Sequence, residues 1–288
     1  MSDEIKLNSA NGIYDPAKAN AKSHVRRKYS KFQGMKIVQN SELQKFVETE
    51  LYHDQSPANI AGRIQKHEKH LVSASKDSIY RYIKSVYGRR VEVYRRKRKT
   101  RRWRRSRAKG EKLKDRTFID KRPQFINRRL RIGDAEADFI VSGKTGKGII
   151  LNVTDRKSRA PFLEQIIEVT TKNVELAFKR IKKRFPELKT ITTDNDILLR
   201  FHKRLEKILG VKIYFCRPFH SWEKGTVENA NGYVRKDIPK GSDISKYSKR
   251  FIRRIEEKLQ RRFMDCLDHL TPLEVIEDYR ETKNARRR

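Results

Sequence analysis

Apolar residues are concentrated between Phe139 and Phe215, where their spacing changes from strand-like to helix-like. Asp134 to Val141 and Lys147 to Asp155 are predicted as two strands joined by a glycine-bearing turn, and 159–169 as a third strand. Helical spacing then begins at Thr171. It stops at Pro186 and is followed by a strand (188–194), a helix (197–209), a strand (211–215) and a helix from about Ser221.

The N-terminal third carries three shorter helical patterns. Apolar residues recur at helical spacing over 41–51 after a capping-type serine, Ser41. Ser56 and Pro57 start a second helix, with serine as the cap and proline at the first helical position. Ser75 caps a third helix over 76–87, whose inner face is predicted to hold Ile79, Ile83 and Val86. Three such helices predict a helix-turn-helix module, although a small bundle that only dimerises has the same pattern.

The two patterns together predict an α/β ribonuclease-H-like domain, a mixed sheet flanked by helices, preceded by an all-α helix-turn-helix module. The expected divisions are a basic N-terminal segment (1–38), the helix-turn-helix (39–88), a basic linker (89–130) and the α/β domain with C-terminal helices (131–288). On the third helix of the module, the residues expected to face DNA are Lys76, Ser78, Arg81 and Lys84.

The strongly positive charge of the chain indicates a polyanionic partner. The formal net charge is +35, and 13 of the 21 residues in 89–109 are Lys or Arg. Such a segment is expected to stay extended until phosphates neutralise it, and release of counterions would drive binding to DNA. The contacts expected here are Arg95, Arg96, Arg101 and Arg102, with Trp103 able to stack on an exposed base.

Neither a membrane span nor a secretory signal is visible in the sequence, because no apolar run approaches the length that either needs. The two cysteines, Cys216 and Cys266, show no metal-ligand spacing and suggest a reducing compartment. We therefore expect a cytoplasmic, nucleoid-associated protein with no membrane partner.

Acidic residues mark the ends of the predicted strands. Asp134, Glu136 and Asp138 share one face of the first strand, so the period of two cannot choose between them. Asp194 ends a central strand, where α/β sheets place their sites. Glu223 and Glu228 open the later helix about 140° apart, so only one of them can face the strands. One acid from each element could hold divalent metals over a phosphodiester.

Several motifs resemble one family. Glu136-Ala137-Asp138, the run from Asp155 to Arg159, Asp194-Asn195, and the stretch from Pro218 to Asn229 are similar to elements of bacterial insertion-sequence transposases of the IS-thirty type. These belong to the Asp-Asp-Glu superfamily, with a ribonuclease-H-like, integrase-type core. The resemblance implies that Asp138, Asp194 and Glu228 are the catalytic, metal-binding acids and that Glu223 is not. Two departures stand out: Asp196 replaces the family's glycine, and 3–8 resembles only the tail of a recognition helix.

By this resemblance the chain is expected to be a transposase that cleaves and transfers DNA strands at the inverted-repeat ends of an insertion sequence. Two Mg²⁺ ions, or Mn²⁺ in their place, would be the cofactors, since oxygen ligands suit them. The partners would be double-stranded transposon-end and target DNA, with a homodimer or higher oligomer pairing two ends. Further phosphate contacts are expected from Arg156, Lys157, Arg159, Lys224, Arg235 and Lys236.

Two other functions are compatible with the sequence. The first is a catalytically silent, transposase-derived DNA-binding regulator, favoured by the short N-terminus and opposed by the three acids. The second is a metal-dependent, structure-selective nuclease on the same fold, which would cleave DNA without joining ends.

Overall fold

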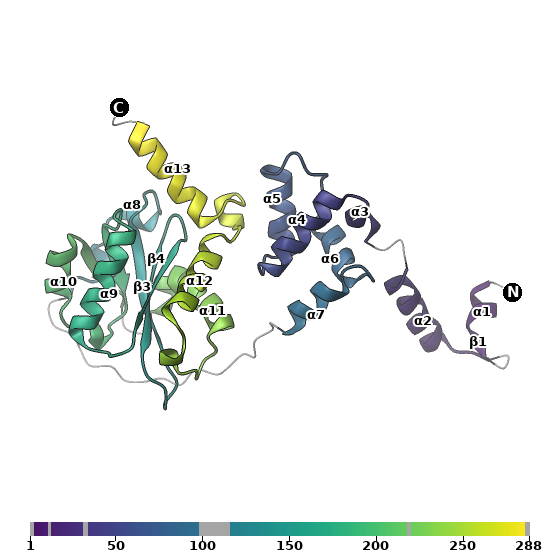
Figure 1. Ribbon diagram of the computed structural model, residues 1–288, viewed down its shortest axis with the longest axis horizontal. Coiled ribbons are helices and arrows are strands. Elements are labelled where there is room, and N and C mark those ends of the chain that lie inside the picture. Colours follow the sequence, from purple (N-terminus) through teal and green to yellow (C-terminus); the bar gives the residue numbers. More distant parts are fainter. Residues whose placement is uncertain (1–2, 11–12, 31–33, 98–115, 218–219, 286–288) are drawn as a thin grey trace. The chain divides into compact units, whose positions relative to one another are not determined.

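The computed structural model describes residues 3–10, 13–30, 34–97, 116–217 and 220–285. The chain divides into two compact units, Met1–Lys99 and Thr100–Arg288. Each unit has its own apolar core, and the five-stranded sheet belongs to the second unit (Figure 1).

A five-stranded mixed sheet forms the centre of the second unit. The strand order is β5-β4-β3-β6-β7, with β3–β4 and β4–β5 antiparallel and β3–β6 and β6–β7 parallel. This is the ribonuclease-H-like order, so the predicted fold class is confirmed. The strands are β3 (Asp134–Val141), β4 (Ile149–Asp155), β5 (Pro161–Ile166), β6 (Thr190–Thr193) and β7 (Lys212–Phe215).

Helices cover both faces of this sheet (Figure 1). Odd-numbered residues of β3, such as Ala137, pack with α9 (Thr171–Arg184) and α10 (His202–Leu209). Even-numbered residues, such as Ile140, pack with α11 (Gly225–Asp237) and α12 (Lys249–Gln260). Because side chains alternate along a strand, the acids of β3 all lie on the α11 side.

Two predicted helices are each divided into two shorter elements. The expected helix over 197–209 is two elements, η2 (Ile197–Leu199) and α10, and the helix expected from Ser221 begins with η3 (Ser221–Lys224) before α11. The remaining elements of this unit are η1 (Ile119–Lys121), α8 (Gln124–Asn127), η4 (Ile244–Lys246), η5 (Asp265–Leu267) and α13 (Pro272–Ala285).

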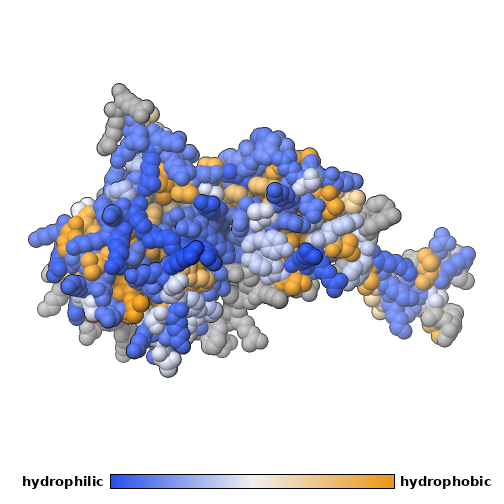
Figure 2. All heavy atoms as spheres, in the orientation of Figure 1, coloured by the Kyte–Doolittle hydropathy of each residue, from blue (hydrophilic) through white to orange (hydrophobic). Residues whose placement is uncertain are grey.

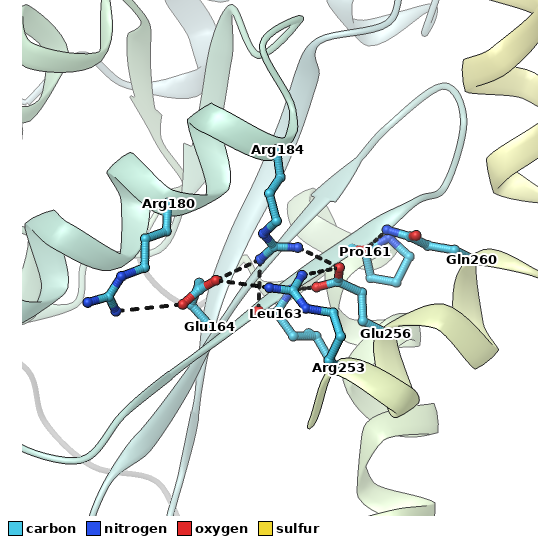
Figure 3. Close-up of polar contacts among 8 residues, drawn as sticks. All are labelled: Pro161, Leu163, Glu164, Arg180, Arg184, Arg253, Glu256 and Gln260. Carbon is cyan, nitrogen blue, oxygen red and sulfur yellow. Dashed lines mark hydrogen bonds and ion pairs between the residues drawn. The ribbon is translucent and has the colours of Figure 1, made fainter. Parts of the chain in front are cut away.

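The edge strand β5 is closed by side chains rather than by another strand (Figure 3). Glu256 on α12 accepts the backbone N–H of Leu163, while Arg184 on α9 donates to the Leu163 carbonyl. Arg184 also pairs with Glu256 and Glu164. These contacts use the backbone groups that an incoming strand would need, which protects the edge from unwanted pairing.

Replacing Glu256 by Ala is expected to lower the free energy of unfolding of this unit by about 2–4 kcal/mol, because it leaves the Leu163 N–H without its acceptor and removes one of the two acids paired with Arg184. Urea unfolding measures the change. The matched control is Glu257→Ala, the same charge change at the exposed neighbouring position, which should stay within about 0.5 kcal/mol of the wild type. Equal losses in both variants would contradict a role for this network.

Helices make up nearly all of the first unit. Its core holds residues from α3, α4, α5, α6 and α7, among them Ile37, Val47, Ile60, Ile79 and Val91. The elements are α1 (Asp3–Asn8), β1 (Ser9–Ala10), β2 (Ile13–Tyr14), α2 (Pro16–Lys28), α3 (Met35–Val38), α4 (Ser41–Tyr52), α5 (Pro57–Lys66), α6 (Lys76–Lys84) and α7 (Arg89–Lys97).

Two predicted helix starts are capped as expected. The Ser56 hydroxyl accepts the N–H of Asn59, and the Ser75 hydroxyl accepts the N–H of Ser78. The helix-turn-helix is α5 and α6 joined by 67–75, with the three predicted helices packed on one core.

Other features of this unit differ from the sequence pattern. The third helix ends at Lys84, so Val86 lies beyond it and is exposed rather than on the inner face. The first part of the basic segment is the helix α7 instead of an extended chain, because Val91 packs into the core and the Tyr94 hydroxyl donates to the Tyr52 carbonyl. The module therefore uses residues on both sides of the expected 39–88.

Hydrophilic residues dominate the visible surface, with apolar residues scattered among them (Figure 2). Within the described ranges, no helix combines the length and the apolar character that crossing a membrane would require.

Candidate active site

Two of the predicted acids meet where β6 ends beside the middle of β3. β3 and β6 are parallel with Glu136 opposite Thr192, so Asp138 is level with Asp194 just beyond the end of β6. Their carboxylates share one partner, the Lys224 ammonium, whose Nζ lies 2.7 Å from Asp138 Oδ1 and 2.7 Å from Asp194 Oδ2. The sheet register therefore brings these acids to a single position occupied by a cation.

Lys224 is held in this position by burial and by charge. The residue is 5% exposed and immediately precedes α11. Burial alone would lower the pKa of Lys224, but the carboxylates of Asp138 and Asp194 raise it above its ordinary value. Burial raises the pKa of Asp138, and the Lys224 ammonium opposes that rise. Lys224 is thus a charged partner of both acids rather than a free surface lysine.

A chain of side-chain amides fixes the second oxygen of Asp138. Asn231 Nδ2 on α11 donates to Asp138 Oδ2 at 2.6 Å, and Asn231 Oδ1 accepts from Asn152 Nδ2 at 2.7 Å. Asn152 Oδ1 in turn accepts from the hydroxyl of Thr154 at 2.9 Å. Each amide has one defined orientation, so Asp138 is rigidly placed.

The other two acids of β3 have structural partners. Glu136, which is 1% exposed, accepts the N–H groups of Thr226 and Val227 at 2.8 and 3.0 Å and pairs with Arg156. Glu136 therefore holds the first turn of α11 against the sheet. Asp134 is paired with Arg131 through both carboxylate oxygens and accepts the hydroxyl of Thr190. These contacts leave Asp138 as the acid of β3 that faces Asp194.

Glu228 lies in the first turn of α11, three residues before Asn231, a spacing that puts the two residues on neighbouring positions of the helix surface. In the described part of the chain, no three His, Cys, Asp or Glu side chains are grouped closely enough to hold a metal ion. The structure thus brings Asp138 and Asp194 together, whereas the use of Glu228 as a third ligand stays a prediction.

Two further acids near the site accept backbone N–H groups. Glu223 accepts the N–H of Arg217 at 2.8 Å, and its other oxygen lies 3.3 Å from His220 Nδ1. Asp196, suggested by the sequence as a spare ligand, has ordinary extended backbone angles and accepts the N–H of Leu198 at 2.9 Å. Asp196 therefore serves first as the cap of η2.

The expected DNA contacts of the second unit fall into different environments. Arg156 is 6% exposed and bonded to Glu136 and the Ile126 carbonyl, so its partners in the structure are protein groups, and its contact with phosphate stays a prediction. The buried Lys224 is likewise engaged by acids. The remaining four are not buried, but each has a protein partner: the Leu130 carbonyl for Lys157, the Thr226 hydroxyl for Arg159, the Val141 carbonyl for Arg235 and the Tyr233 ring for Lys236.

In the first unit, Lys76, Arg81 and Lys84 are exposed along α6 as expected. The Ser78 hydroxyl lies 3.1 Å from that of Ser75, and Arg95 donates to the Gln55 carbonyl. Arg101, Arg102 and Trp103 and the side chain of Arg96 lie outside the described residues.

Sequence reasoning missed Asn152 and Asn231, and it did not foresee that Lys224 pairs with Asp138 and Asp194. A signal was available for each. In the sequence, Lys224 and Asn231 are seven residues apart, which is close to two helical turns, so a helix predicted from Ser221 would place both on one face with Glu228. Asn152 is the residue opposite Asp138 in the β3–β4 hairpin. The exposed Trp222, stacked on His220, is a further aromatic side chain close in sequence to the site.

Comparison with known proteins identifies relatives over nearly the whole chain. The chain is 34% identical over 280 residues to the transposase for insertion sequence element IS4351 of Bacteroides fragilis, covering 94% of this chain and 83% of that protein. The chain belongs to the insertion-sequence transposases. This family member is also 29% identical over 290 residues to transposase InsI of element IS30A of Escherichia coli strain K12, covering 96% and 75% of the two chains. The IS-thirty-type resemblance is therefore confirmed.

The chain of this transposase-family member was also compared with solved structures and with family models. The catalytic core domain of BIV integrase is a structural neighbour with a TM-score of 0.41 and 18% identity, covering 53% of this chain and 98% of that one. No family model matches the sequence.

Proposed function

We propose that this chain is an Asp-Asp-Glu transposase that cleaves DNA at the inverted-repeat ends of an insertion sequence and transfers the strands to target DNA. The observation that carries the proposal is the convergence of Asp138 and Asp194 on one buried cation, Lys224 Nζ, in a member of the transposase family. A regulator with no catalytic role would not need two partly exposed carboxylates held on one buried ammonium.

Divalent metal fits the residues at this position. The donors are carboxylate oxygens, which Mg²⁺ and Mn²⁺ prefer, and Asp194 Oδ1 is a buried oxygen without a hydrogen-bond partner in the described chain. Asp138 and Asp194 would hold the metal, with Glu228 as the third ligand, and two ions are expected. When bound, the metal would supply Lewis-acid activation of the attacking oxygen and stabilisation of the leaving oxygen.

The chain's own residues have separable tasks around that centre. Asn231 holds Asp138 in one orientation, and Glu136 holds the helix that carries Glu228. Lys157, Arg159, Arg235 and Lys236 are the proposed phosphate contacts of the second unit. The exposed cations of α6 would locate the transposon ends, and two protomers would be needed to pair two ends.

The decisive experiment incubates the protein with plasmid DNA that carries the gene and its flanking sequence, with Mg²⁺ or with EDTA. Joined products that require Mg²⁺ are expected. Nicks without joining would favour the nuclease function instead, and DNA binding without any cleavage would favour the regulator.

Removing the Lys224 ammonium is expected to expose the repulsion between the two acids. Without metal, Lys224→Met should lower the free energy of unfolding by about 1–3 kcal/mol, because Asp138 and Asp194 then face each other without a cation. Added Mg²⁺ should raise the melting temperature of the variant more than that of the wild type, since no ammonium competes for the position. Lys240→Met, at an exposed position, is the control. An equal response to Mg²⁺ in all three proteins would argue against a shared cation position.

A further inference from the structure

A cavity of about 250 Å³ lies beside α11, in the second unit. Arg129 and Arg159 line it together with the polar side chains of Thr226 and Asn229, and an apolar wall is provided by Pro161, Leu259 and Met264. This volume is slightly below the roughly 300–1,000 Å³ of small-molecule pockets, so a small, partly planar ligand would fit.

The two arginines bring positive charge that no acid offsets. None of the described residues lining the cavity is acidic. The Arg129 guanidinium has no hydrogen bond or ion pair within the described residues. Arg159 donates from Nη1 to the Thr226 hydroxyl, but its Nε is buried without an acceptor in the described chain. The Arg159 side chain thus has donors that the protein does not fully use, and charged N–H donors form strong hydrogen bonds with anionic oxygens.

The backbone N–H groups at the start of α11 are not available to bind an anion in the cavity. The N–H groups of Thr226 and Val227 are already bonded to Glu136. Attraction for an anion therefore comes from the arginine pair, whose planar donors match phosphate oxygens. Both arginines have left-handed backbone angles, φ 55° at Arg129 and φ 63° at Arg159, which L-residues rarely adopt.

We infer that this cavity binds one unpaired nucleotide of DNA, with its phosphate on Arg129 and Arg159 and its base against the apolar wall. Asn229 offers both a donor and an acceptor to the edge of a base. Pro161, Leu259 and Met264 form the surface for the base itself. The inference rests on the proposed function, because that function supplies the DNA from which an unpaired nucleotide would come.

The cavity and the acids lie on different sides of one helix. Gly225, Asn229 and Tyr233 line the cavity at a spacing of four residues. Glu228 and Asn231 lie roughly 130° around the helix axis from the line of Gly225, Asn229 and Tyr233, at about 100° per residue, and Asn231 contacts Asp138. A nucleotide in the cavity would thus contact the helix that carries the proposed third acid without occupying the acid site.

Cys266 provides a reporter for this cavity. It lines the cavity and is exposed, whereas Cys216, the other cysteine, is buried. Maleimide labelling of Cys266 in the full chain, followed by intact-mass spectrometry, would be measured with thymidine 5′-monophosphate, thymidine or inorganic phosphate at equal ionic strength. A millimolar dissociation constant is expected for the monophosphate, so a concentration about ten times higher should slow labelling about ten-fold. Thymidine and phosphate alone should protect much less.

Arg129→Ala and Arg159→Ala should each lose this protection. Arg128→Ala should keep it, because it makes the same charge change at an exposed neighbour that does not line the cavity. Protection by phosphate equal to that by the monophosphate would overturn the nucleotide assignment, as would protection that persists in both cavity variants or is absent in the wild type. Labelling needs no cleavage, so failure here is distinguishable from failure of the transposase proposal.

Discussion

Replacing Asp194 by Asn is expected to lower strand cleavage by at least about 10³-fold while DNA affinity stays unchanged or rises. The substitution keeps the size of the side chain and removes the charge that would bind metal, and a loss of this size corresponds to about 4 kcal/mol of transition-state stabilisation. DNA is negatively charged, so the loss of a negative charge reduces repulsion and should not weaken DNA binding. Cleavage of a plasmid carrying the transposon ends and DNA affinity at one fixed salt concentration are the two measurements.

The matched control is Asp196→Asn, two residues along the same loop. Asp196 Oδ1 accepts the Leu198 N–H, and an amide oxygen can take over that bond. This variant should retain cleavage within about ten-fold of the wild type, or about 1.4 kcal/mol. A parallel loss of cleavage and DNA binding in Asp194→Asn would remove the case for a metal ligand.

Replacing Glu136 by Ala is expected to lower cleavage by about 10²-fold although Glu136 does not face the acids. The carboxylate holds two N–H groups in the first turn of α11 and pairs with the buried Arg156. Without it, Glu228 would lose its position relative to Asp138, and a displacement of about 1 Å can cost 10²-fold in rate. Glu136 is thus a positioning residue, and the loss should appear in kcat more than in KM.

Two variants separate positioning from a general loss of stability. Glu136→Gln keeps an oxygen for the N–H groups of Thr226 and Val227 and should recover part of the cleavage. Asp134→Ala removes another buried acid paired with an arginine on the same strand face, so it should cost comparable stability. Asp134 makes no bond to α11 among those described, and cleavage should persist at temperatures where the variant is folded. Equal loss in Asp134→Ala and Glu136→Ala would show that the effect is destabilisation.

Much of the fold follows from local patterns in the sequence. The strand Asp134–Val141 has the predicted bounds, and the order of strands and helices identifies the ribonuclease-H-like sheet. Ser56 and Ser75 cap the helices that they were expected to cap. These features depend on spacing and on near neighbours in the chain, which is the information that a single sequence displays directly.

Other elements depend on contacts that are distant in the chain. The sequence pattern of 89–97 is dominated by like charges, yet the segment is helical because Val91 and Tyr94 find partners in the helical unit. Arg156 resembles a phosphate-binding arginine in the sequence, but in the structure it forms an ion pair with the buried Glu136. Local charge cannot reveal such partners, because burial is decided by the whole fold.

The sequence by itself determined the class of fold, the basic character of the chain and the set of acids from which the site is drawn. The family resemblance selected Asp138 from Asp134, Glu136 and Asp138, and only the tertiary structure shows how the surroundings of the three differ. The period of two places all three on one face of β3, and their roles diverge because different elements cover that face at each level. Arg131 lies at the level of Asp134, the start of α11 at Glu136, and Lys224 with Asp194 at Asp138.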